Sequence, residues 1–292
     1  FSTLFYDAFI VDVADRQSVG KISGFSWGLG YLGGLIALSL AAPLINKGLG
    51  PDNLVRYQLS FVVAAVFFLV FALPMFFFVK QHAVRESARA WKESFTHAFD
   101  SIVQLWRERR LHRHFFLLVL AFFFYNDALS TLFAFTAIFA QFTIGMSLGE
   151  ITTLLAVIQL LAFPSSWFFG SLADILGQKQ IIFTTLSIVL IFSSVAAFTE
   201  SKTIFFIALC LASLGIGASQ SCTRALIRHM IPEHQSSQFF GFQSFLGKFS
   251  SFLGPLLFGY LSSTFQNQRI GFFAVGSFLI VGMILLWFVK SE

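Results

Sequence analysis

Residues 151–199 read ITTLLAVIQLLAFPSSWFFGSLADILGQKQIIFTTLSIVLIFSSVAAFT. Two apolar runs in this stretch are separated by a short polar loop, and a membrane-spanning helix needs about 20 mostly apolar residues. Unbroken runs of this length exclude a membrane β-barrel, whose strands are about ten residues of alternating polarity. The stretch therefore predicts two membrane-spanning helices joined by a tight turn.

The same pattern recurs along the whole chain of 292 residues. We expect one partial and eight full spans, at roughly 1–14, 21–45, 56–79, 114–141, 149–173, 180–199, 203–228, 237–264 and 270–289. Charged residues make up only 11% of the chain, against roughly 25% in soluble domains, and this hydrophobicity also excludes intrinsic disorder. The sequence therefore predicts an all-α polytopic membrane protein.

One polar segment, residues 80–113, is longer and more basic than the other breaks. Its aromatic residues recur at roughly helical spacing, which favours an amphipathic helix at the membrane surface, although a solvated linker fits residues 80–90 equally well. We expect this segment to separate an N-terminal part, residues 1–79, from a C-terminal part, residues 114–292. The chain opens inside an apolar segment, so we expect it to be an N-terminally truncated fragment.

Positive charges divide unequally between alternate loops. The set that contains 80–113 and the C-terminus holds 15 of the 19 Lys and Arg residues. Because cytoplasmic loops are enriched in Lys and Arg, this asymmetry predicts a cytoplasmic central loop and C-terminus. It also explains the basic composition without a nucleic-acid partner.

An internal repeat is visible at a shift of 217 residues. The shift lays Gly24 and Phe25 on Gly241 and Phe242, and each pair opens a small-residue-rich span after a polar hinge. Repeats in membrane chains are typical of duplicated helical halves around a central binding site. We therefore expect a transporter built from two related halves, part of the first lying upstream of residue 1.

The loop at 170–179 carries the most specific motif, Gly-x3-Asp-x2-Gly-x-Lys. It resembles the second-half copy of the signature loop of the major facilitator superfamily, with Ile175 and Gln178 as departures from the arginine-rich pattern. The residues that carry the resemblance are Gly170, Asp174, Gly177 and Lys179. It implies a partial major facilitator fold, from the end of helix 4 through helix 12, in which Asp174 could lock one conformation.

Three further strings narrow the resemblance. Residues 5–9 read FYDAF, residues 24–34 read GFSWGLGYLGG and residues 124–131 read FYNDALST. Together they are similar to the branch that contains the autophagy-related vacuolar amino-acid effluxers and their bacterial relatives. The resemblance implies export of a small solute, with amino acids as the substrates of the vacuolar members.

A mid-membrane carboxyl group is the first candidate site residue. Asp127 lies about 12 residues into its span, roughly 18 Å deep, and ionisable groups at such depth face a cavity or a partner. This placement suits a proton-coupling carboxylate, and a structural paired Asp is the alternative. Lys248, at similar depth in its own span, is the expected partner, and Asn126 is a neighbouring polar candidate.

Arg224 is the second buried cation, and the shift of 217 places it opposite Asp7. We expect an inter-half gate or an anchor for a substrate carboxylate, with plain interfacial anchoring as the alternative. Gln220, Gln159 and Tyr125 are further polar candidates for a cavity.

Glycines at Gly24, Gly28, Gly30 and Gly34 recur at short helical intervals. Small residues let helix backbones approach closely in membranes, so we interpret them as a sliding helix contact rather than a substrate site.

Other function classes find less support. No nucleotide-binding loop, zinc site or catalytic triad is readable, so we expect no enzyme activity and no cofactor. A non-transporting receptor or scaffold that keeps the fold remains an alternative, which a fully packed centre without a cavity would favour. The expected partners are a small solute, protons and lipid around a monomer, and the few cysteines fit a bacterial inner membrane.

Overall fold

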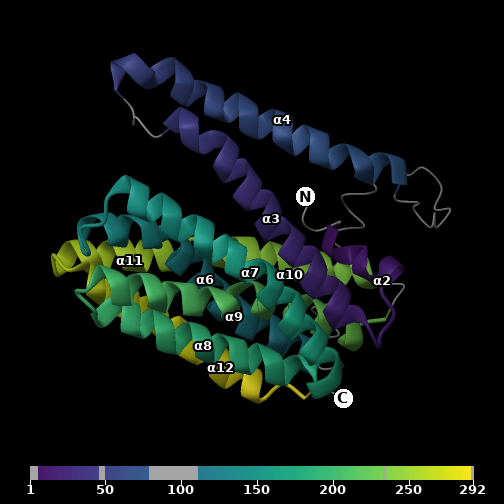
Figure 1. Cartoon of the computed structure of the whole chain (residues 1–292). Helices are drawn as coiled ribbons and strands as arrows, with labels where there is room; N and C mark the ends of the chain where they lie inside the picture. The colour runs from purple at the N-terminus through teal and green to yellow at the C-terminus, as the bar shows by residue number, and fades with distance from the viewer. Residues whose placement is uncertain (1–5, 46–49, 79–110, 233–234, 291–292) are drawn as a thin grey trace, which may run out of the picture.

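Helices make up all regular structure in the part of the chain that we describe, residues 6–45, 50–78, 111–232 and 235–290 of a computed structural model (Figure 1). Within these described residues, seven helices are long and apolar enough to cross a membrane. They are α3 (Val19–Ile45), α4 (Leu54–Phe78), α6 (Arg113–Phe142), α7 (Leu148–Leu176), α8 (Gln178–Phe198), α9 (Lys202–Met230) and α12 (Gln268–Trp287). The all-α polytopic prediction is confirmed, and these seven match expected spans to within a few residues.

Two expected spans differ from the prediction. The span at 237–264 is divided into α10 (Ser236–Ser250) and α11 (Leu253–Thr264). Pro255 has no N–H to donate to the carbonyl group of Ser251, and its ring clashes with that carbonyl in a regular helix. The partial span at 1–14 shows only the short helix α2 (Ile10–Val13) and a few helical residues before it. The expected linker at 80–113 lies, except for its last three residues, outside the described residues.

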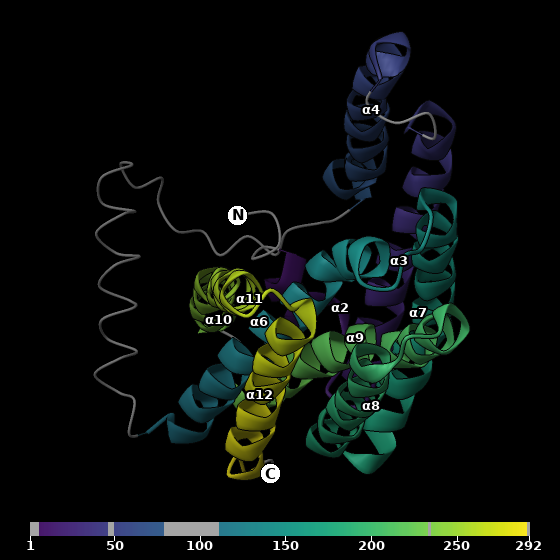
Figure 2. The same ribbon diagram turned by 90° about the vertical axis from the view of Figure 1, so that its left-hand side faces the viewer.

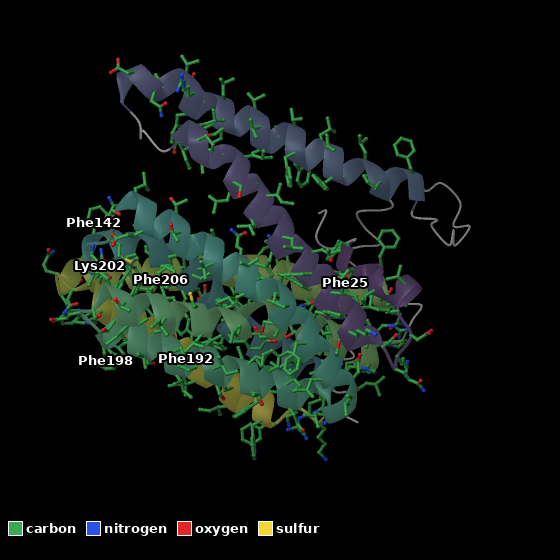
Figure 3. All side chains as sticks on the ribbon, viewed as in Figure 1. Phe25, Phe142, Phe192, Phe198, Lys202 and Phe206 are labelled. Atoms are coloured by element: carbon green, nitrogen blue, oxygen red, sulfur yellow. The ribbon has the colours of Figure 1, made fainter. Side chains whose placement is uncertain are left out.

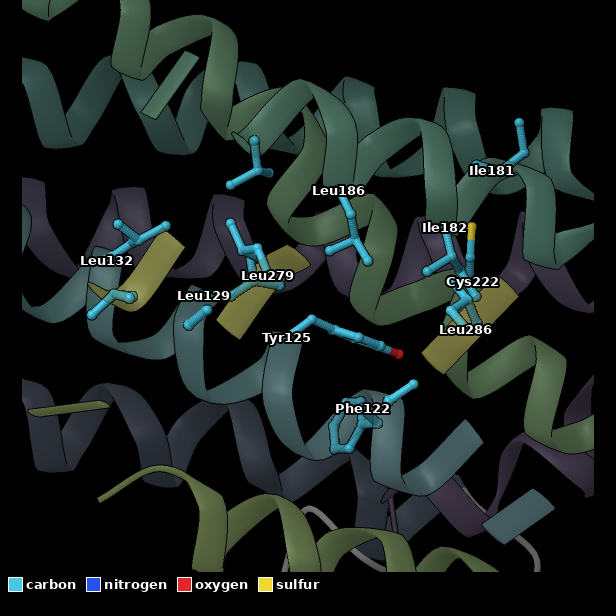
Figure 4. Packing of buried hydrophobic residues seen from close by; sticks show 14 of the residues in the cluster. Phe122, Tyr125, Leu129, Leu132, Ile181, Ile182, Leu186, Cys222, Leu279 and Leu286 are labelled. Atoms are coloured by element: carbon cyan, nitrogen blue, oxygen red, sulfur yellow. The ribbon is translucent and has the colours of Figure 1, made fainter. Parts of the chain in front are cut away.

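The C-terminal block, residues 111–290, forms one bundle around a shared core. Figure 4 shows Tyr125 of α6 among Leu129, Leu186 of α8 and Leu279 of α12, all of them buried. Close packing of such side chains against one another holds the helices of the bundle together. The bundle supplies most walls of the site described below.

The N-terminal block, residues 6–78, meets this bundle mainly through α3. Helix α3 packs along α7 and also contacts α9. Helix α4 packs on α3 and stands apart from the bundle in both views (Figures 1 and 2). Its apolar side chains are largely exposed, as Phe68 (70%) and Phe77 (76%) illustrate, which suits a surface in contact with lipid.

The bundle has two chemically distinct ends. Figure 3 places Phe142 and Lys202 at one end and Phe25 towards the other. At the first end Ser147 and Glu150 cap α7, and Lys202 pairs with Glu150 at 3.1 Å. Both side chains of this pair are exposed, so it adds little stability. The 170–179 loop and the C-terminus lie at the other end.

Candidate functional site

A polar cavity of about 180 Å³ opens between the two blocks. The N-terminal block contributes Asp7 and Trp27, and α9 contributes Gln220 and Arg224. The remaining lining residues are Phe122, Asn126 and Ser130 of α6, Gln243, Ser244, Gly247 and Lys248 of α10, and Ser251 at the end of α10. Two cations and one acid therefore face a common space, together with several amide and hydroxyl groups.

Arg224 and Asp7 form an ion pair in the lining of this cavity. The Arg224 guanidinium lies 3.3 Å from the Asp7 carboxylate, with side chains only 4% and 14% exposed. Its Nε donates to the Ser23 hydroxyl at 2.9 Å and its other terminal nitrogen donates to the Ser23 carbonyl at 3.2 Å. Its guanidinium also stacks over Tyr6, 4.9 Å from the ring centre. The expected contact between these two positions, 217 residues apart, is therefore present as a buried ion pair.

Asn126 and Gln220 extend the polar wall. The Gln220 side chain donates to the Asn126 amide oxygen at 3.0 Å, and Asn126 donates in turn to the Gly247 carbonyl at 3.2 Å. This chain of bonds links α9, α6 and α10 across the cavity. Lys248 is exposed beside it.

The expected ion pair between Asp127 and Lys248 is wrong. Within the described residues, both carboxylate oxygens of Asp127 are buried without a side-chain hydrogen-bond partner, and no ion pair joins them to Lys248. The residue next in sequence, Asn126, faces the cavity instead, because adjacent residues of a helix point about 100° apart. The sequence shows the depth of a mid-span residue but not which face of the helix it occupies.

Two further candidates lie outside the cavity lining. The Tyr125 hydroxyl shares a hydrogen bond of 2.6 Å with the Thr223 hydroxyl inside the packed core. The Gln159 side chain packs on Gly34 of α3, at the contact between α3 and α7. Both residues are therefore structural in this arrangement, and the prediction that they line the cavity is wrong.

Residues 170–179, which the sequence suggested as a loop, are the end of α7, Gly177 and the start of α8, and they bind the ends of two other helices. The Asp174 carboxylate accepts hydrogen bonds from the backbone N–H groups of Gly20 at 2.7 Å and Lys21 at 2.8 Å. These are first-turn groups of α3, which have no partner within their own helix, and the positive end of a helix dipole favours an anion there. Asp174 thus caps a helix of the N-terminal block from the C-terminal block.

The other residues of the loop serve the same junction. Lys179 donates to the Trp287 and Val289 carbonyls at 2.8 and 2.6 Å, where α12 ends. Gly177 joins α7 directly to α8 at φ +98°, a backbone conformation that L side chains rarely adopt. Gly170 lies against Gly24, with their Cα atoms close enough that a Cβ on Gly170 would be 3.0 Å from Gly24.

Three of the four α3 glycines make the expected close contact with α7. A Cβ on Gly24 would collide with the Ser166 carbonyl, and one on Gly28 would be 2.8 Å from the Phe163 ring. Gly34 lies under Gln159. Gly30 is an exception, since no described atom lies within 4 Å of its added Cβ, and its assignment to the helix contact is wrong.

Several cavity residues were missed in the sequence. Gln243, Ser244, Gly247 and Ser251 were missed, and together with the candidate Lys248 they lie at intervals of one, three and four residues, so they share one helical face. That polar stripe in an apolar span is a readable signal. Trp27, which looked like a packing residue, also lines the cavity, and its buried indole nitrogen has no partner among the described residues; nothing in the sequence distinguishes it from a packing tryptophan.

The comparisons with known proteins agree with this architecture. Residues 11–292 match the family described as "Vacuole effluxer Atg22 like". The chain belongs to this family. Across its full length it is 28% identical to an uncharacterized MFS-type transporter of Bacillus subtilis, YxiO, and spans 68% of that protein. It is 22% identical to Autophagy-related protein 22 of Vanderwaltozyma polyspora over 93% of this chain, but spans only 57% of that relative.

Solved structures show the same fold for this Atg22-like chain. The Escherichia coli fucose:proton symporter FucP superposes with a TM-score of 0.68 at 18% identity, over 99% of this chain and 73% of FucP. The human organic anion transporter MFSD10 superposes with a TM-score of 0.69 at 14% identity, over 96% and 66%. The fold is that of the major facilitator superfamily, and the protein is a multi-pass membrane protein of the MFS transporter type.

Proposed function

We propose that this protein is a secondary active transporter that exports a small polar solute, an amino acid in the first instance, by alternating access. The observation that carries the proposal is the polar cavity between the two blocks. Its volume of about 180 Å³ lies below the range of pockets for drug-sized ligands, about 300–1,000 Å³. The cavity therefore suits a solute smaller than a drug-sized molecule. A receptor or scaffold with a fully packed centre would have no use for this space.

The charges around the cavity fit a solute with one carboxylate and one ammonium group. Arg224 has five N–H donors, of which three bind Ser23 and Asp7. The two remaining donors, together with Lys248, can bind a carboxylate, and Asp7 can accept from an ammonium group. A solute carboxylate on Arg224 would compete with Asp7 and so weaken the closure on that side.

The position of the Arg224–Asp7 pair supports a rocking motion of two halves. The two residues are 217 apart, the same shift that relates the two repeats. Positions related by a two-fold axis can touch only where they lie close to that axis, as in an isologous contact. We infer that 1–79 and 114–292 belong to the two halves, that 80–113 links them, and that this pair lies on their common axis.

The closed side carries the signature loop and faces the cytoplasm in the orientation given by the positive charges. Asp174 on the α3 N-terminus and Arg224 on Asp7 hold this side shut, and the glycine contact between α3 and α7 lets the blocks meet closely. Export would begin when these contacts are broken and a solute enters the cavity from the cytoplasm. The proton gradient supplies the driving force, and a monomer in a bacterial inner membrane is sufficient for the cycle.

Equilibrium binding tests the solute site. Labelled amino acids are titrated onto the purified full gene product in a scintillation proximity assay, with Arg224→Gln beside Lys290→Gln as a matched loss of charge outside the cavity. We expect at least one amino acid to bind, about tenfold or more weakly in Arg224→Gln because a charged hydrogen bond contributes about 1.5–3 kcal/mol, and unchanged in Lys290→Gln. Binding of none of the amino acids, or equal weakening in both variants, would remove the assignment.

A further inference from the structure

Asp127 and Thr131 of α6 bury three side-chain oxygens outside the cavity, and none of them has a side-chain partner within the described residues. Asp127 of α6 is fully buried, and its carboxylate lies at the backbone N–H of Gly254 without a hydrogen bond to any side chain within the described residues. The Thr131 hydroxyl has no side-chain partner there either, and Thr131 is 1% exposed. Since the two residues are four apart on one helix, they share a face. Buried polar groups are seldom left unpaired, so this cluster indicates a site that binds something small.

The cluster faces the first turn of α11. A Cβ built on Gly254 would lie 3.0 Å from both oxygens of Asp127 and would collide with the Thr131 hydroxyl. Gly254 is the second residue of α11, where backbone N–H groups have no partner within the helix and a negative charge is favoured. The absence of a side chain on Gly254 lets the carboxyl group approach this turn.

The same turn is the joint between α11 and the cavity wall. Helix α10 ends at Ser250 and α11 begins at Leu253, with Pro255 behind the break. Helix α10 carries four cavity-lining residues, among them Gln243 and Lys248, and Ser251 directly after it also lines the cavity. A change at Gly254 therefore reaches the cavity through the short segment, Ser251 and Phe252, that joins the two helices.

Charged groups on the neighbouring helices are committed elsewhere or lie in the cavity. On α9, Arg224 is held by Asp7, and Arg228 and His229 lie in the last turn of the helix. On α12, Arg269 donates to the Ala197 carbonyl. On α7, Glu150 pairs with Lys202 and Asp174 caps α3. Helix α10 contributes Lys248, which lines the cavity, and α11 contributes only the exposed Tyr260.

We propose that Asp127, Thr131 and the first turn of α11 form a proton-binding site that controls the angle between α10 and α11. In the neutral form the O–H of the carboxyl group donates a hydrogen bond to the Thr131 hydroxyl oxygen. In the charged form it accepts from the N–H groups of the first turn of α11. When the carboxyl group releases or takes up this proton, its partner therefore changes between Thr131 and the first turn of α11. This change moves α10, which forms one wall of the cavity. The inference rests on the proposed transport function and assigns its coupling site.

The site has a readout that does not depend on transport. Infrared difference spectra of the full gene product, recorded through a pH titration, show the C=O stretch of a protonated carboxyl group. We expect one band that Asp127→Asn removes and Thr131→Val displaces, while Thr131→Ser, which keeps the hydroxyl, leaves it in place. A band that survives Asp127→Asn, or that ignores Thr131→Val, overturns the assignment.

Coupling to the cavity is tested with a pair of glycine variants on one helix. Gly254→Ala adds a methyl group against Asp127 and Thr131, whereas Gly259→Ala adds one where no described atom lies within 4 Å. We expect the proton concentration for half-maximal solute flux to change about tenfold in Gly254→Ala and in Thr131→Val, the effect of roughly one hydrogen bond. We expect no change in Gly259→Ala or Thr131→Ser. Equal pH profiles for the two glycine variants contradict the coupling route.

Solute counterflow without a pH gradient separates the two proposals. It requires the solute site and alternating access but no net proton movement. Counterflow that persists in Asp127→Asn while gradient-driven flux is lost supports the proton site. Gradient-driven flux that persists in Asp127→Asn overturns the proton site and leaves the transport function intact, whereas absence of counterflow in the unaltered protein counts against the transport function itself.

Discussion

Asp174→Asn should open the side of the protein that carries the signature loop. The carboxylate accepts from the Gly20 and Lys21 N–H groups at 2.7 and 2.8 Å, and hydrogen bonds to a charged group contribute about 1.5–3 kcal/mol each. Asn keeps one neutral acceptor oxygen, worth about 1 kcal/mol. With the partial exposure of Lys21 discounted, the loss is about 2 kcal/mol, or roughly a 30-fold change in the ratio of closed to open molecules.

Spin labels measure this change directly. Gln17, before α3, and Leu111, before α6, are both exposed, so labels there report the distance between the blocks by double electron–electron resonance. If the closed form is favoured about 100-fold, a 30-fold loss leaves roughly a quarter of the molecules open, seen as a second, longer distance.

Asp15→Asn is the matched control, because it removes the same charge from the exposed turn before α3 without touching the Asp174 bonds. The reasoning is refuted if Asp174→Asn and Asp15→Asn give the same distance distribution as the unaltered protein.

Three further predictions concern the helix contact, the ion pair and the core. Gly24→Ala should lower the free energy of unfolding by about 1–3 kcal/mol, because the added methyl group overpacks against the Ser166 carbonyl. Gly30→Ala, the control, should leave the thermal midpoint unchanged. Equal midpoints for the two variants would exclude the α3–α7 contact. Arg224→Lys should bind solute more weakly than the unaltered protein, since the two hydrogen bonds to Ser23 need a guanidinium group. A titration in which Arg224→Lys binds solute as tightly as the unaltered protein would contradict this. Tyr125→Phe should cost about 1 kcal/mol in chemical denaturation and leave solute affinity unaltered, because Tyr125 lies outside the cavity; a weakened affinity would return it to the site.

The sequence determines the spans because each one is an apolar run long enough to be recognised by itself. The contact between Asp7 and Arg224 was also predictable, because a repeat shift relates positions across a symmetry axis without any knowledge of packing. Asp174 was predictable as a group that locks one conformation, although its partner, the α3 N-terminus, was not.

The local environment of Asp127 shows where sequence reasoning ends. Depth along a span gives the height of a residue in the membrane, and Lys248 at similar depth looked like a partner. The face that each side chain occupies depends on helix rotation and packing, which place Asp127 against Gly254 and Lys248 in the cavity. The Gly254-Pro255 pair was a legible signal for the break in that span, since Pro removes a helical hydrogen bond.

The proposal of a gradient-driven exporter is tested most directly by flux through the full gene product in proteoliposomes. The vesicles are loaded with mixed labelled amino acids, a pH gradient is imposed, and the unaltered protein is compared with Asp127→Asn. We predict gradient-dependent movement of at least one amino acid that Asp127→Asn abolishes. Absence of flux for every amino acid would contradict the assigned substrate class, and flux that ignores the gradient would contradict proton coupling.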